Sequence, residues 1–166
     1  MNAIALADQL IRVGEYDVIV AGGMESMTNA PHLLMNSRVG FKLGDATLKD
    51  SMIFDGLFCS IDQMGMGEAT DKNNPRYLIT RQAQDEFAYQ SHQRAAKAQS
   101  EGVFDQEIVP VELKDRKGNV TLFANDEGVR ADISFEALAK LQSVFSPTGT
   151  ITAGSSSQIS DGGAAV

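Results

Sequence analysis

The chain has 166 residues, of which 43% are apolar and 22% are charged, and its formal net charge is −8. This composition is enough for one domain with a core and too apolar for a disordered tail, while the acidic balance disfavours a general nucleic-acid binder, whose surface is basic. Cys59 is the only cysteine, which excludes a disulfide framework, and no apolar run approaches the roughly 20 residues that cross a bilayer. We therefore expect a cytoplasmic protein with no nucleic-acid partner and no membrane partner.

The first predicted element is a helix over residues 3–13, where apolar residues recur at helical spacing around most of the circumference. Residues 16–21 follow as a continuous apolar run, which predicts a buried strand of an α/β layer ending at Gly22 and Gly23. The flanking strands that such a buried strand needs are hard to find in the sequence. We therefore expect this part to be the middle of a larger sheet.

Residues 29–62 are punctuated by proline and glycine, and they predict a long excursion with little regular structure, of the kind that often carries binding loops. A short helix is expected over residues 64–74, ending before Pro75. Thr80 is a candidate N-cap for a long helix that reaches Gly102.

Two strand candidates, residues 108–113 and 120–123, are separated by turn-forming residues and predict a hairpin. A short helix is expected next, over residues 134–141.

Residues 150–154 predict a strand that leads into three serines, and Ser160 and Asp161 are expected to cap a helix beginning at Gly162. Because the elements at both ends look interrupted, we expect these residues to be an excerpt of a longer chain.

Candidate cysteine chemistry rests on Cys59, with His32 and His92 as the only histidines. Cys59 lies in the loose excursion, His32 follows a proline in a loop, and His92 lies among polar residues of the long helix, where we expect it to be solvated. An inert, half-buried thiol is therefore favoured over a catalytic dyad. The two histidines and the scattered carboxylates do not have the spacing of metal ligands.

The small residues at 153–157 could let a ligand lie against the backbone, with a following helix N-terminus supplying N–H donors. An ordinary serine-rich turn explains the same residues equally well. Arg130 could stack on a base or meet a phosphate, or it could pair with Glu127 or Asp132. The glycines at 22 and 23 lack the spacing of phosphate-binding loops, so a tight turn is the favoured interpretation.

Residues 2–8, 20–27 and 152–156 resemble, in this order, segments of the thiolases, the acetyl-CoA C-acetyltransferases and 3-ketoacyl-CoA thiolases. Further matches lie between them, and the resemblance covers essentially the whole chain. It implies acyl transfer to or from coenzyme A through a cysteine thioester, as thiolysis of acetoacetyl-CoA or 3-ketoacyl-CoA or as Claisen condensation of acetyl-CoA in fatty acid metabolism.

The resemblance also implies an α/β thiolase-like fold, made of part of the N-terminal αβα half and the loop domain that binds coenzyme A. Residues 1–28 would belong to the N-terminal core, residues 29–148 to the loop domain, and residues 149–166 to the returning core. A homo-oligomer, dimer or tetramer, is implied for the longer protein. No cofactor is implied, because coenzyme A is the substrate.

The resemblance further implies a set of side chains that contact coenzyme A. They would pack on the adenine, supply apolar contacts, form the wall along the pantetheine, and line the channel for the acyl group and pantetheine. In that order they are Arg130; Phe145 and Ile159; Ala153 and Ser157; and Leu57 and Met66.

Two positions depart from family patterns, since Gly65 stands where acetyl-specific bacterial enzymes carry histidine and Ala137 where some members carry a serine. Both departures leave the preferred acyl-chain length open. Glu25 is expected to be structural. The family's catalytic motifs Cys-x-Ser-Gly-Met-Asn-Ala, Gly-His-Pro and Cys-x-Gly-Gly-Gly do not occur in these residues, and Cys59 matches none of them. We therefore expect the chain alone to be inactive; the alternative is a non-catalytic module for coenzyme A binding or oligomer contacts.

Overall fold

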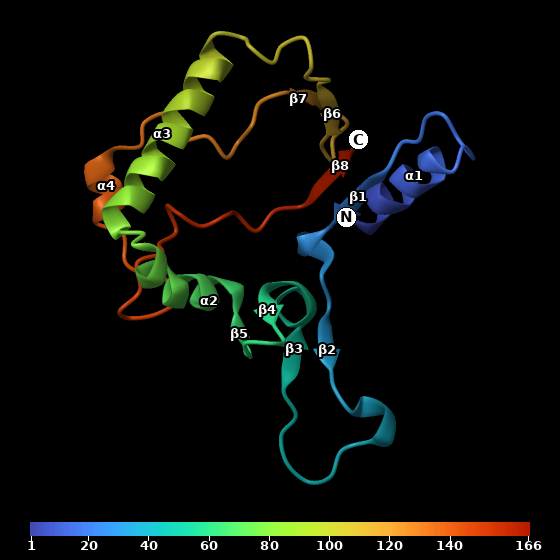
Figure 1. Ribbon diagram of the computed structural model, residues 1–166, viewed down its shortest axis with the longest axis vertical. Helices are drawn as coiled ribbons and strands as arrows, with labels where there is room; N and C mark the ends of the chain where they lie inside the picture. Colours follow the sequence, from blue (N-terminus) through green and yellow to red (C-terminus); the bar gives the residue numbers. More distant parts are fainter. The chain divides into compact units, whose positions relative to one another are not determined.

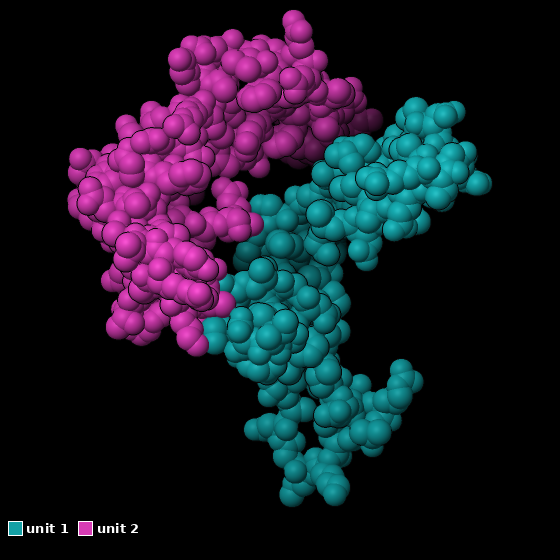
Figure 2. All heavy atoms as spheres, viewed as in Figure 1, with its two compact units in different colours: residues 1–66, 159–166 teal, residues 67–158 magenta.

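A computed structural model describes residues 1–166 and divides the chain into two compact units (Figures 1 and 2). Unit 1 comprises residues 1–66 and 159–166, and unit 2 comprises residues 67–158. These bounds group the chain differently from the family domains expected at residues 28 and 148, which stay a prediction. None of the helices combines the length and the apolar composition that a membrane span needs.

Unit 1 consists of one long helix, several helical turns and short antiparallel strand pairs. Its elements are α1 (Asn2–Arg12), β1 (Gly22–Glu25), η1 (Met27–Asn29), β2 (His32–Leu34), η2 (Ser37–Val39), β3 (Leu48–Asp50), the π-helical η3 (Met52–Leu57), β4 (Phe58–Cys59), β5 (Met64–Gly65) and β8 (Gly162–Ala165). The pairs are β1 with β8, β2 with β3, and β4 with β5. The loose excursion expected from residue 29 is thus a series of short paired segments.

The prediction of a buried strand over residues 16–21 is wrong in its bounds and in its burial, because the paired strand starts six residues later, at Gly22, and its four residues are exposed. A strand forms where a partner supplies hydrogen bonds, and the partner here is β8, whose ladder begins with reciprocal bonds of 2.9 Å between Ala21 and Val166. The expected helix at Gly162 is wrong for the same reason, because residues 162–165 form that partner strand.

Asp161 does act as a cap, but of a different turn. Its carboxylate accepts hydrogen bonds from Thr28 N (2.8 Å) and Ser26 Oγ (3.0 Å), so it closes the start of η1 instead of a helix after it. The bond from the Thr28 amide is the largest cause that lowers the pKa of Asp161 below its ordinary value. This contact between residues distant in sequence ties the β8 segment to η1 within unit 1.

Unit 2 contains two helices of eight and twenty residues, a short helix and one hairpin. The elements are α2 (Met66–Asn73, its first residue in unit 1), η4 (Asn74–Tyr77), α3 (Arg81–Ser100), β6 (Val111–Lys114), β7 (Val120–Phe123) and α4 (Phe135–Ala139). The helix before Pro75, the long helix and the hairpin confirm the sequence predictions. Thr80 Oγ1 accepts from Ala83 N at 3.1 Å, so the expected N-cap is also confirmed.

The core of unit 2 lies where α3 meets α4 and residues 151–152. Leu138 of α4 and Thr152 are completely buried, and Ala88 and Ile151 are nearly so. The expected strand over residues 150–154 is wrong, because only Thr152 forms a bridge, to Ser143. Hydrogen bonds made by serine hydroxyls build a turn in this stretch in place of a ladder.

Candidate functional site

Three of the predicted coenzyme A contacts meet at one cavity in unit 2. Arg130, Ala153 and Ser157 line a cavity of about 570 Å³ together with α4 and His92. We call it the Arg130 cavity. Its size lies within the range of about 300–1,000 Å³ that is typical of small-molecule sites. The remaining lining residues are Ile133, Ala137, Leu138, Leu141, Gly154, Ser156 and Gln158.

The segment that carries Arg130, residues 126–131, is held along α3 by three side chains of that helix. His92 Nδ1 accepts from Arg130 N at 3.1 Å, Gln93 Nε2 donates to Ala131 O at 3.3 Å, and Gln99 Nε2 donates to Asp126 O at 3.3 Å. We call residues 126–131 the Arg130 segment. Without regular secondary structure of its own, this segment takes its position from α3.

The side chain of Arg130 remains available to a ligand. The ion pairs in the structure are Arg12–Asp8, Arg81–Asp85 and Lys97–Glu101, so the alternative of pairing with Glu127 or Asp132 is wrong. Arg130 is exposed at the cavity. A planar guanidinium in this position is able to stack on a base or donate to a phosphate.

One wall of the cavity is α4, a helix of only five residues that is too short to be stable by itself. Arg81 of α3 holds its C-terminal end, with Nη2 donating to Leu138 O at 2.7 Å and to Leu141 O at 2.9 Å. The same guanidinium pairs with the buried Asp85 at 2.8 Å. The pair therefore fixes α4 against α3.

The stretch of small residues forms a second wall, next to α4. Gly154 packs so closely on α4 that a Cβ at this position would clash with the Leu138 side chain. Asp71 of α2 anchors the start of this stretch, since its Oδ1 accepts from Thr150 N (2.7 Å), Thr150 Oγ1 (3.0 Å) and Ile151 N (3.3 Å). The wall is therefore held from both of its neighbouring helices.

Residues 153–157 were expected to form either a serine-rich turn or a ligand contact. Each interpretation describes part of this stretch. Ser155 Oγ accepts from Thr152 N at 3.0 Å and Ser156 Oγ donates to Thr152 O at 2.8 Å, so these two hydroxyls build a turn. Ser157 is exposed and lines the cavity. No helix follows, so the expected N–H donors of a helix N-terminus are not part of this site.

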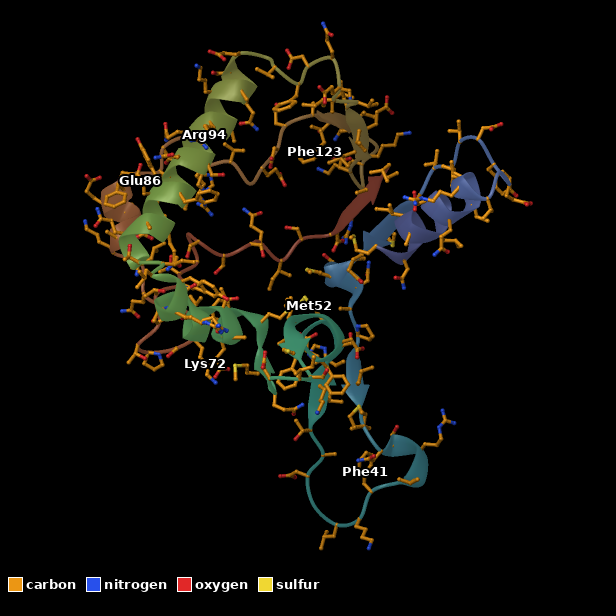
Figure 3. The ribbon with its side chains drawn as sticks, in the orientation of Figure 1. Phe41, Met52, Lys72, Glu86, Arg94 and Phe123 are labelled. Carbon is orange, nitrogen blue, oxygen red and sulfur yellow. The ribbon has the colours of Figure 1, made fainter.

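His92 is the residue that sequence reasoning missed. It is half-buried, where we expected a solvated side chain, and it lines both the Arg130 cavity and an adjoining cavity of about 630 Å³. The helical period could have predicted its partial burial, because His92 follows the buried Asp85 and Ala88 by seven and four residues and so lies on the same face of α3. On α3 the exposed polar ladder is instead Glu86–Gln90–Arg94, whose ends are labelled in Figure 3.

The other predicted contacts lie elsewhere. Phe145 is in unit 2 but packs against Gly67 and is not among the residues that line the Arg130 cavity. Leu57 ends η3 in unit 1, where it lines a cavity of about 240 Å³ with Glu25, Met27, Asp55 and others. Met66 and Ile159 are also in unit 1, and both are more than half exposed. The contacts of these four with coenzyme A stay predictions.

Cys59 is half-buried, as expected, and its hydrogen-bond partner is Asp62. The thiol donates to Asp62 Oδ2 at 3.5 Å and accepts from Asp62 N at 3.4 Å, and no histidine takes part. Glu25 forms part of the β1–β8 pair, opposite Gly162, and accepts from Ser26 N at 3.1 Å. No group of three His, Cys, Asp or Glu side chains is placed to hold a metal ion.

A family model described as the thiolase N-terminal domain matches residues 1–166. The chain belongs to the thiolase family. It is 57% identical over its whole length to a probable acetyl-CoA acetyltransferase of Mycolicibacterium smegmatis and 55% identical to one of Mycobacterium tuberculosis. The chain spans 43% and 42% of the lengths of these two relatives, so it corresponds to less than half of each.

Solved thiolase structures share the fold. An acetyl-CoA acetyltransferase from Syntrophomonas wolfei superposes with a TM-score of 0.90 at 40% identity, covering 99% of this chain and 41% of the other. Human mitochondrial 3-ketoacyl-CoA thiolase superposes with a TM-score of 0.88 at 37% identity, with the same coverage. The expectation of an α/β thiolase-like fold, in its N-terminal part, is therefore confirmed.

Proposed function

We propose that the protein to which these residues belong transfers acyl groups to or from coenzyme A, and that the Arg130 cavity binds part of the coenzyme A molecule. The observation that carries this proposal is that Arg130, Ala153 and Ser157, three positions that the family resemblance implies as coenzyme A contacts, line the same cavity. The names of the mycobacterial relatives, acetyl-CoA acetyltransferases, support the acyltransferase activity.

The chemistry of the cavity suits such a ligand. Coenzyme A presents a base, phosphates and a long flexible chain. The Arg130 guanidinium supplies the positive charge and the planar surface for the first two, in a chain whose formal net charge is −8. Small residues at 153, 154 and 156 leave room for a chain to lie close to the backbone.

The test is coenzyme A binding by calorimetry to the full-length protein that carries these residues, as wild type and as Arg130→Ala. We expect the substitution to weaken binding about tenfold or more, which corresponds to about 1.4 kcal/mol. Arg94→Ala is the matched control, because Arg94 is an exposed arginine of the same unit bound to Gln90. Equal affinities of wild type and Arg130→Ala would refute the assignment of the cavity.

The 166 residues by themselves are proposed to be inactive. The family's nucleophile motif has no match in them, and Cys59, bonded to Asp62, has no basic partner that would make it a nucleophile. Purified chain should show no thiolysis of acetoacetyl-CoA, and thiolysis that disappears in Cys59→Ser would refute this. Coenzyme A binding by a full-length protein without any acyl transfer would favour the non-catalytic module instead.

Assembly and compartment are also proposals. The family resemblance supports a homo-oligomer of the full-length protein, which light scattering would measure directly. The single thiol supports the cytoplasm, where thiols stay reduced. Fractionation of the source cells would test that location.

A further inference from the structure

The hydrogen bond between His92 and Arg130 joins residues 38 positions apart along the chain. Arg130 N donates to His92 Nδ1 at 3.1 Å. The imidazole is half-buried between two cavities, with Gly154, Ser156 and Ser157 lining both of them beside it. His92 therefore sets the backbone position of the residue that the proposed function assigns to coenzyme A.

This bond requires one protonation state of the imidazole. Nδ1 accepts only when it carries no proton, so His92 must be neutral with its hydrogen on Nε2. An imidazolium would turn Nδ1–H toward Arg130 N–H, donor against donor. The neighbouring hydrogen bonds from Gln93 and Gln99 have side-chain amide donors, which do not titrate. Of the three side chains that hold the Arg130 segment, His92 is therefore the titratable one.

No carboxylate lines either of the two cavities beside His92. Among the residues that line the two cavities with His92, from α2, α3, α4, the Arg130 segment and residues 151–158, Arg130 is the only charged one. Tyr89 and Arg94 of α3, Asp126 and Glu127 of the Arg130 segment, and Asp132 just after it are the titratable groups near His92 and Arg130 in sequence, and they line neither cavity.

We propose that His92 is a positioning residue for coenzyme A binding: neutral, it holds the Arg130 backbone so that the guanidinium meets the nucleotide end of the ligand, and protonated, it releases that segment. The proposal rests on the proposed function of the Arg130 cavity. It goes beyond that function because it makes the affinity for the nucleotide end, and not for the pantetheine end, depend on the protonation of one helix residue.

The test compares two substitutions of His92 in the full-length protein. His92→Phe keeps a planar ring and removes the acceptor, while His92→Asn places Oδ1 where Nδ1 lies and does not titrate. His32→Phe is the matched control, since the only other histidine is exposed on β2 in unit 1. Affinities are measured by calorimetry for coenzyme A and for pantetheine, which lacks the nucleotide, at about pH 8 and about pH 5.5.

At the higher pH we expect His92→Phe to weaken coenzyme A binding about fivefold to tenfold, the range expected for one lost hydrogen bond, and to leave pantetheine binding unchanged. His92→Asn should bind like the wild type there. At the lower pH, coenzyme A binding should weaken more in the wild type than in His92→Asn. The phosphates of the ligand titrate equally in both measurements, so their contribution cancels from the difference. His92→Phe should weaken coenzyme A binding less in the Arg130→Ala background than in the wild type.

Several outcomes would overturn the proposal. They are an unchanged coenzyme A affinity in His92→Phe, an equal loss of pantetheine binding, or the same pH dependence in wild type and His92→Asn. If His92→Phe does not fold, the pH comparison with His92→Asn still decides the question. Failure of the proposed function is separate, because it would appear as an Arg130→Ala protein that binds coenzyme A normally whatever the residue at 92.

Discussion

Replacing Asp71 with alanine should loosen the wall of the Arg130 cavity from a distance. Asp71 lies on α2 and is only 7% exposed, and its Oδ1 accepts three hydrogen bonds from Thr150 and Ile151. Those two residues lead directly into the small residues that line the cavity. The carboxylate is therefore the anchor that sets where this wall begins.

The expected magnitude follows from the groups left without a partner. The amide of the buried Ile151 loses its acceptor, and so does that of the half-buried Thr150, at about 1–3 kcal/mol for each buried donor and less where water enters. Part of this loss is offset, because Asp71 Oδ2 is buried with no hydrogen-bond partner and its desolvation cost also disappears. We expect Asp71→Ala to lower the free energy of unfolding by about 2–3 kcal/mol, and Asp71→Asn, which keeps Oδ1, by about 1 kcal/mol.

The assay is urea unfolding of wild type and variants followed by circular dichroism, with amide hydrogen exchange at Ile151 as the local measurement. Lys72→Ala is the control, because Lys72 is the exposed neighbour of Asp71 on α2 (Figure 3) and should change stability by no more than about 0.5 kcal/mol. A loss below about 1 kcal/mol in Asp71→Ala, or exchange at Ile151 no faster than in Lys72→Ala, would refute the anchoring role.

Three shorter predictions follow from single contacts. Gly154→Ala should cost about 1–3 kcal/mol by overpacking against α4 and should weaken coenzyme A binding, and an unchanged melting temperature would contradict the close packing. Leu138→Ala should cost about 2–5 kcal/mol in urea unfolding, because Leu138 is completely buried; a loss under about 1 kcal/mol would show that α4 does not pack there. The third concerns Asp161, whose pKa is lower in the folded state than in the unfolded state, where it is about 3.9. Its contacts therefore stabilise the fold fully above the unfolded pKa. This stabilisation is lost as the pH falls through the folded pKa. The Thr28 amide shift, followed by NMR, should therefore titrate below that value in the wild type and not in Asp161→Asn, and a midpoint at or above the ordinary value would argue against the contact.

Much of unit 2 could be predicted from local sequence signals. Thr80 caps α3 by accepting from Ala83 N, and the turn between β6 and β7 is closed by Asp115, which accepts from the backbone of Lys117 and Asn119. Each of these contacts joins residues four positions apart or fewer, so the local sequence is enough to predict them. The side chain of Asn119, which is the largest cause, and its backbone amide also lower the pKa of Asp115, again through neighbours in sequence.

The prediction that failed most clearly concerned residues 16–21 and the segment after Gly162. Apolar composition indicated a strand close to β1, but it did not give the bounds of that strand. Strand bounds depend on the pairing partner, and β8 lies about 140 residues away from β1 in sequence. A helix and a strand both begin plausibly at a glycine pair after an aspartate. The available pairing partner, and not the local pattern, decided between them.

The sequence by itself determined the family, the helices of unit 2, the hairpin and three residues of the Arg130 cavity, because these follow from motif order and from contacts between near neighbours. Only the tertiary structure decided which residues hold the site together. Asp71, Arg81 and His92 act on backbone groups 38 or more residues away, and nothing in their immediate neighbours in sequence specifies those partners. Such contacts arise when packing brings distant segments within hydrogen-bond distance, so they are properties of the folded chain.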